Sequence, residues 1–247
     1  MIKLFKKIRY DLMNKSKTGK YFKYAIGEVV LVVIGILIAL QINNWNEKQK
    51  INSKTQEYYI QLLDDLKKDI VFSKHNIEES SAYLEEYKAY TDAYSRDVLT
   101  PTQVYEQISK LTLIAAPLTF NTSTFESLQS TGDIGLIPSH IRNRLIDLRR
   151  LQNLTIKRFE DADDGKNEIT QNLSLLVGST TLPERLVNQP EMKEFLNIDK
   201  NLKELILVYE GIHRWKSISL QEAKVRLEQM QNEISAIVDL IHTEIKK

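Results

Sequence analysis

The stretch YAIGEVVLVVIGILIALQINNWNE, Tyr24–Glu47, is the most apolar part of this 247-residue chain. Val29–Leu40 has no polar side chain, and the apolar character extends over residues 25–42 with two polar breaks. A helix of about eighteen residues, at about 1.5 Å per residue, spans roughly 27 Å, close to the ~30 Å hydrocarbon core of a bilayer. The sequence therefore predicts a transmembrane helix over residues 24–45, with the lipid bilayer as its partner.

The flanks of this helix predict its orientation. Tyr24 and Trp45 lie at its two ends, where aromatic rings with a polar edge favour the headgroup region. Residues 1–23 carry eight basic side chains against one acid, Asp11. The basic residues are Lys3, Lys6, Lys7, Arg9, Lys15, Lys17, Lys20 and Lys23. By the positive-inside rule, residues 1–23 form a basic cytoplasmic segment and residues 46–247 an extracytoplasmic domain.

Two other interpretations of the apolar stretch are a cleaved signal peptide and a buried helix of a soluble domain. A signal peptide should be followed by a small-x-small cleavage site, but the stretch ends in ALQINNW, a poor site. A buried helix would need neither the one-sided charge nor the aromatic ends. We therefore expect an uncleaved anchor.

Inside the anchor, Gly27, Leu31, Gly35 and Ala39 are spaced by four and share one helix face. Small residues four apart allow close helix packing, so this face predicts self-association or docking on a partner helix, although membrane helices are rich in Gly and Ala generally. Glu28 is the one ionisable group within the span. It lies about one turn from the cytoplasmic boundary, which favours a carboxylate that reaches the interface over one with a function.

The composition predicts an all-α fold. Only 8 Gly and 5 Pro occur, and the 42% apolar content is enough to build a core. Cysteine is absent, which excludes disulfides and thiolate metal sites. The net charge is +1, and residues 1–23 contribute +7, so the remainder carries −6. Such a remainder lacks the basic excess of a nucleic-acid-binding protein, so nucleic acid is not an expected partner.

Apolar residues at steps of three, four or seven predict a first amphipathic helix from about Tyr59 to 95–100, continuous with the anchor through 43–49. Thr100–Gln103 reads as a capping box with proline at the first helical position, which predicts a helix to about Ile114. Ser123–Glu126 repeats this pattern before a short helix.

Gly132 has the character of a left-handed C-cap, and the helical period then resumes from Ile141 to Leu176. Pro190 opens a minor helix in a loose connector. In the last segment, from Leu202 to Ile241, apolar residues recur at steps of three or four, with one gap around Lys216. We call such a row of apolar residues along one helix face a seam.

Three long helices and several short ones predict an elongated extracytoplasmic bundle. The sustained seams can be an intramolecular core or a coiled coil with another copy of the chain, and we favour the core because three long helices supply one another with partners.

No catalytic or metal-binding motif is evident, so we expect a protein that is not an enzyme and binds no cofactor or metal. Glu210 and His213 match the E-x-x-H spacing of di-iron bundles, with Asp239 and His242 as a weaker copy. Both pairs lie on one predicted helix, which favours solvated surface pairs. The acidic run 160–165 lacks the final acid of a calcium loop and reads as a helix surface.

Two sequence blocks carry a resemblance to a known family. The stretch Tyr24–Glu47, with the basic opening before it, resembles the N-terminus of a family of uncharacterised single-pass membrane proteins from Bacteroidetes. The block TFESLQSTGDIGLI, Thr124–Ile137, is similar to a mid-chain motif of the same family. The resemblance implies a Gram-negative inner membrane with a periplasmic body, and it implies no activity.

The leading hypothesis is therefore an envelope protein that binds another protein or serves as a scaffold in an inner-membrane assembly. The alternatives are a periplasmic bundle that senses a ligand, and an enzyme with an unrecognised carboxylate or metal site.

Overall fold

The computed structural model describes residue 10 and residues 18–179 and 181–246 of the chain. Every regular element among these residues is a helix, which confirms the all-α class. The chain divides into a first unit that ends at Glu57 and a compact second unit that begins at Tyr58.

Helix α2, Thr18–Arg96, includes the predicted anchor and the predicted first helix of the bundle. Its apolar residues in the first unit are exposed, with Leu31 at 67% and Leu40 at 53%. Among the described residues, α2 is the one helix that is long and apolar enough to cross a membrane, and none of its most apolar window is buried in protein. The apolar stretch is therefore not a core helix of this chain.

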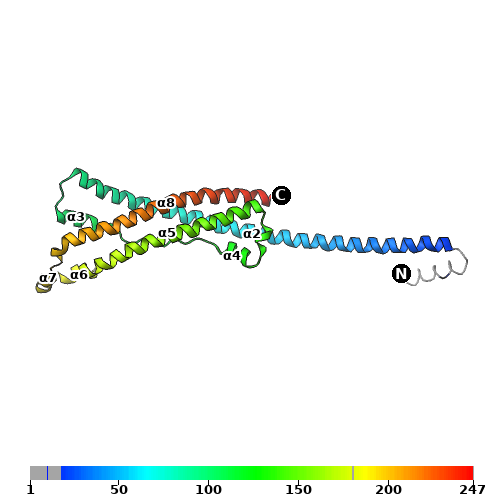
Figure 1. Ribbon diagram of the computed structural model, residues 1–247, viewed down its shortest axis with the longest axis horizontal. Coiled ribbons are helices and arrows are strands. Elements are labelled where there is room, and N and C mark those ends of the chain that lie inside the picture. The colour runs from blue at the N-terminus through cyan, green and yellow to red at the C-terminus, as the bar shows by residue number, and fades with distance from the viewer. Residues whose placement is uncertain (1–9, 11–17, 180, 247) are drawn as a thin grey trace. The chain divides into compact units, whose positions relative to one another are not determined.

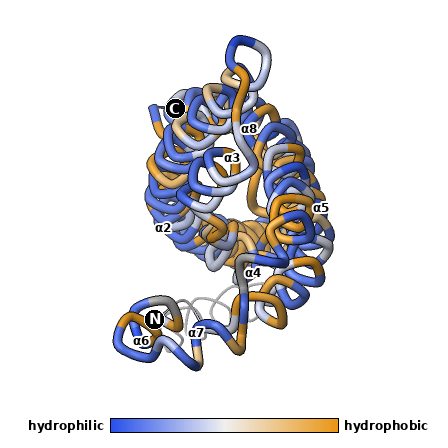
Figure 2. The backbone as a smooth tube through the Cα atoms, turned by 90° about the vertical axis from the view of Figure 1, so that its left-hand side faces the viewer, coloured by the Kyte–Doolittle hydropathy of each residue, from blue (hydrophilic) through white to orange (hydrophobic). Residues whose placement is uncertain are grey.

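The second unit is built on three long helices: the later part of α2, α5 (Ser139–Val177) and α8 (Leu202–Ile245). Figure 1 shows α5 and α8 running antiparallel, and Figure 2, along the bundle, shows α2, α5 and α8 around a common centre. Helices α5 and α8 pack closely along their length, whereas α2 approaches both at longer range.

The predicted α8 seam is buried within a single chain. Met230, Ile234 and Ile237 have no exposed surface, and they pack in one core with residues of α2, α4 and α5. The seams are therefore an intramolecular core, as favoured from the sequence.

Short elements connect the long helices: α3 (Pro101–Ile108), α4 (Ser123–Ser130), η1 (Asp133–Leu136), α6 (Leu182–Leu186), α7 (Pro190–Leu196) and η2 (Ile198–Asn201). The capping box of α3 is confirmed, because Thr100 Oγ1 accepts the Gln103 N–H at 3.3 Å and Gln103 Oε1 accepts the Thr100 N–H at 2.9 Å. The predicted end of this helix at Ile114 is wrong. The helix ends at Ile108, and residues 112–122 have no regular structure.

The predicted capping box at Ser123 is also wrong. The N-cap of α4 is Thr122, whose side chain makes no capping bond and instead donates to Glu126 Oε1 at 2.8 Å. A carboxylate from α2 takes the capping role, since Asp65 Oδ2 accepts the Thr124 N–H at 3.1 Å and the Ser123 hydroxyl at 3.3 Å. Local sequence cannot reveal a cap that comes from a distant helix.

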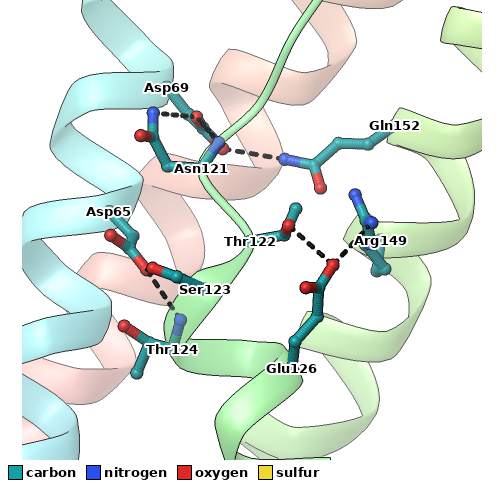
Figure 3. A network of polar contacts seen from close by, with 9 residues as sticks. All are labelled: Asp65, Asp69, Asn121, Thr122, Ser123, Thr124, Glu126, Arg149 and Gln152. Carbon is teal, nitrogen blue, oxygen red and sulfur yellow. Dashed lines mark hydrogen bonds and ion pairs between the residues drawn. The ribbon is translucent and has the colours of Figure 1, made fainter.

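A second α2 carboxylate, Asp69, holds the residues just before α4 (Figure 3). Asp69 Oδ1 accepts the backbone and side-chain N–H groups of Asn121 at 2.7 and 2.9 Å, and Oδ2 accepts Gln152 Nε2 of α5 at 2.8 Å. Asp69 is buried, and this burial raises the pKa of its carboxyl against the opposing effect of these bonds. We call Asp65 and Asp69 with their partners the aspartate latch, because it joins α2, α4 and α5.

The turn after α4 matches the prediction. Gly132 has φ of +78°, a left-handed conformation that costs glycine little. The next residue, Asp133, accepts the hydroxyl of Tyr58 at 2.7 Å. The block Thr124–Ile137 therefore forms α4, this turn and η1, and is bonded to α2 at both of its ends.

Replacing Asp69 by alanine should destabilise the bundle, because three N–H groups would lose their acceptor, among them the buried amide of Gln152. We expect Asp69→Ala to lower the free energy of unfolding by about 3 kcal/mol. The control is Asp64→Ala on the same helix, where the side chain is 61% exposed and forms an ion pair with Lys68, so a change of at most about 0.5 kcal/mol is expected. Urea unfolding of the full chain in mild detergent, followed by circular dichroism, measures both. Equal effects would contradict the latch.

Candidate functional site

The gap in the α8 seam is occupied by a lysine that points into the bundle. Lys216 is 3% exposed, and its Nζ donates to the carbonyl oxygens of Thr112 and Ile114 at 2.7 and 2.8 Å. The same ammonium lies 4.0 Å from the centroid of the Tyr83 ring. These bonds satisfy two carbonyl groups of the segment after α3, which has no helical N–H donors to pair with them.

A row of tyrosines lies on α2 at helical spacing, at positions 83, 87, 90 and 94. Successive rings of the row have centroids 5.4 to 6.2 Å apart. The hydroxyl of Tyr90 donates to Glu210 Oε1 at 2.5 Å, and that of Tyr83 shares a hydrogen with His213 Nδ1 at 2.8 Å. The row fills the wider space between α2 and α8 with large aromatic side chains.

The prediction that Glu210 and His213 form a solvated surface pair is wrong. His213 has no exposed surface, and Glu210 is half-buried against Tyr90. Residues 209, 213, 216 and 220 follow each other at helical spacing, so the histidine belongs to the inward face of α8. The second pair differs, since His242 is exposed. Within the described residues, no group of three His, Asp or Glu side chains could hold a metal ion.

Burial decides the charge states at this site. Burial, with the Lys216 ammonium nearby, lowers the pKa of His213 to about 4, so the imidazole is neutral at pH 7. Burial, with the Lys166 ammonium, lowers the pKa of Lys216 to about 8, while Asp163 and Glu86 act in the opposite direction. Burial also raises the pKa of the Tyr83 hydroxyl. A neutral tyrosine–histidine pair therefore lies beside a largely protonated lysine.

The outer nitrogen of His213, Nε2, has no hydrogen-bond partner among the described residues. The Ile108 carbonyl acts to raise the pKa of the ring, but it falls outside hydrogen-bond geometry. Among the described residues, the His213 side chain thus makes one hydrogen bond, to Tyr83.

A cavity of about 420 Å³ adjoins Lys216 and Tyr83. Its mouth lies between α2 and the 112–116 segment, where Glu79, Ala82 and Glu86 are exposed, and its floor includes the buried side chains of Leu220 and Leu227. Most of the floor is apolar. We call this space the lysine cavity.

A smaller cavity of about 260 Å³ lies between α5 and α8 and shares Phe159 and Ala223 with the lysine cavity. Trp215, which lines it, packs over Gly165, where an added Cβ would lie 3.6 Å from the indole. The acidic run 160–165 is thus a turn of α5 in contact with α8, and not a loop.

The residues singled out in the anchor make few contacts within the chain. Gly27 and Gly35 have nothing within 4 Å of an added Cβ, and Tyr24 and Trp45 are more than 60% exposed. The helix face that includes Leu31 and Ala39 is likewise exposed, whereas Glu28 is half-buried. Lys23 is exposed, the side chain of Lys20 is not described, and the other six basic residues lie outside the described part of the chain.

Sequence comparison places the chain in a family. The model of a family of unknown function, DUF6090, matches residues 28–198, more than half of the chain, so the chain belongs to this family. No curated protein and no solved structure matches it.

His213 should make the bundle less stable in mild acid. The unfolded chain binds a proton at His213 near pH 6.5, whereas the folded chain does so only near pH 4. His213 therefore contributes up to about 3 kcal/mol to the free energy of unfolding above pH 6.5, and this contribution is lost progressively as the pH falls from 6.5 to 4. His213→Asn, which keeps an acceptor for Tyr83, should remove this dependence.

The matched control is His242→Asn, at an exposed histidine on the same helix, which should retain the acid sensitivity of the natural chain. Urea unfolding at a series of pH values measures the difference. If the free energy of unfolding depended on pH in the same way in both variants, His213 would have to be solvated in the folded chain, which would contradict the prediction.

Proposed function

We propose that this member of the DUF6090 family is a membrane-anchored protein-interaction module and not an enzyme. In this proposal residues 24–45 cross the inner membrane once, residues 1–23 lie in the cytoplasm, and residues 46–247 form a periplasmic domain. The bundle binds another protein, as a scaffold or subunit of an envelope assembly.

An exposed apolar surface at one end of the bundle supports this proposal most directly. It includes Leu175 in the last turn of α5, Val187 after α6, and Met192 and Phe195 of α7, with exposed fractions of 85, 75, 50 and 82%. The end of α5, α6 and α7 lie at the same end of the bundle (Figure 1). We call these four residues the apolar tip. Large apolar side chains gathered on a surface are typical of protein-binding sites.

The apolar tip differs from the seams because its four side chains are exposed, and no described residue of the second unit buries them. Residues of α2 and α5 bury the apolar seam of α8 within one chain. The seam therefore does not need a coiled coil with another copy to bury it. The tip residues, by contrast, leave apolar area in water at a cost of about 25 cal/mol for each Å². A protein partner with an apolar groove would remove that cost.

The anchor supports the proposed location. Its exposed apolar surface, the aromatic residues at its ends and the basic cluster on one side fit a single span with the N-terminus in the cytoplasm. Gly27, Gly35 and Ala39 leave room for close packing of a second helix, which offers another route to a protein partner or a second copy.

A ligand-sensing bundle is the second candidate function. The lysine cavity favours it, because its volume lies within the range of small-molecule sites, about 300 to 1,000 Å³, and it combines an apolar floor with a few polar groups.

The proposed topology predicts the outcome of a protease experiment. Protease added to spheroplasts should digest residues 46–247 and leave a short, membrane-bound fragment that contains the basic segment. Alkaline carbonate should leave the undigested chain in the membrane pellet, because no described residue buries the most apolar window of the helix. A protected C-terminal domain, or release of the whole chain by carbonate, would contradict the location.

Photo-crosslinking tests the apolar tip. A benzophenone amino acid at position 195 of the full chain, in its native membrane, should give a covalent adduct with a partner protein that mass spectrometry identifies. The control is the same substitution at Leu207, an apolar residue of α8 that is 63% exposed and lies outside the tip. An adduct between two copies of the chain would identify self-association, and equal adducts at both positions, or none, would contradict a specific tip.

A further inference from the structure

Lys216 is a buried cation without a paired anion. Among the described residues, its ammonium meets two carbonyl oxygens and the face of Tyr83, but no carboxylate lies within ion-pair distance. A buried charge normally has an ionic partner, since carbonyl dipoles offset only part of its desolvation cost. Its neighbour Lys166 is different, because Asp163 pairs with it directly.

The ammonium also has one N–H group without a hydrogen-bond acceptor among the described residues. It carries three N–H groups, and the two carbonyl bonds, to Thr112 and Ile114, use two of them. Lys216 is one of the residues that line the lysine cavity. A ligand in the cavity can thus reach a charged side chain that is itself only 3% exposed.

The shape of the cavity comes from small side chains. Ala82 at the mouth and Ala115 and Ala223 deeper in the wall leave space that larger residues would fill. The buried lining combines Leu220, Leu227 and other apolar groups with two polar side chains, Asn76 and Ser80. This arrangement places one cation beside an apolar chamber, which matches a molecule with one anionic end and an apolar body.

Two carboxylates stand at the mouth of the cavity and oppose an anion. Glu79 and Glu86 are exposed, so water and salt screen their charges, and Glu79 already lies 3.3 Å from His75 Nε2. Lys216 is 3% exposed, and its charge is screened much less. The nearer, buried charge therefore dominates for a ligand inside the cavity.

We propose that the lysine cavity binds a small amphiphile whose single anionic head group accepts the third N–H of Lys216, while its alkyl body lies against Leu220 and Leu227. The face of Tyr83 is already taken by Lys216, so a cationic ligand would find no free aromatic surface there and would meet a like charge. The proposal does not depend on the apolar tip, and the crosslinking result leaves it unchanged.

Three probes with the same alkyl chain and different head groups test the proposal: octanoate, octylammonium and octanol. The full chain in lipid nanodiscs is titrated with each by calorimetry, and the heat from empty nanodiscs is subtracted. Octanoate should show saturable binding at least about tenfold tighter than the other two, since a hydrogen bond to a charged group is worth that factor or more. Absence of saturable octanoate binding, or tighter binding of octylammonium, would overturn the proposal.

Two variants locate the site. Lys216→Met should weaken octanoate binding about tenfold or more, but it also removes the two bonds to the 112–114 segment. Ala82→Trp fills the mouth without touching the lysine, and it should abolish octanoate binding. The control is Ala89→Trp, at an exposed alanine two turns further along α2 that does not line the cavity, which should bind octanoate as the natural chain does. Unchanged affinity in Ala82→Trp would overturn the proposal.

Discussion

Helices α5 and α8 pack against each other at close range, whereas α2 stays farther from both. Close packing of all three would need small or interlocking apolar residues on every inward face, but the inward face of α2 carries aspartates at 65 and 69 and tyrosines at 83 and 90. The wider space is filled by these side chains and by the 112–122 segment, which runs between the helices without regular structure. The lysine cavity is the part of this space that no side chain fills.

The polar groups in this space hold segments that have no helix of their own. Asp65 and Asp69 accept backbone and side-chain N–H groups of residues 121–124, and Lys216 donates to two carbonyl oxygens of residues 112 and 114. An irregular segment that packs against a bundle must find partners for the backbone groups that it buries, because unpaired buried ones are costly. Charged side chains of α2 and α8 supply those partners and fix the register of the segment.

Much of the fold could be predicted from the sequence, because apolar period and capping residues are local signals. The seam of α8, the capping box at Thr100 and the turn at Gly132 are confirmed. The site was harder to predict, since a pattern of apolar positions treats Lys216 as a gap and His213 as a surface residue. The sequence did contain a partial signal. His213 and Lys216 lie at helical spacing from Tyr209 and Leu220, which is the spacing expected of residues on the same inward face of the helix.

The family match ends at residue 198, before α8 begins, yet the matched part cannot form this bundle alone. The buried face of α5, with Leu145, Leu148 and Phe159, packs in one core with the α8 seam, and Tyr83 of α2 has its hydrogen-bond partner on α8. Without a helix in the place of α8, these groups would be exposed or unpaired. The last helix thus completes both the core and the lysine cavity, although the shared family pattern stops before it.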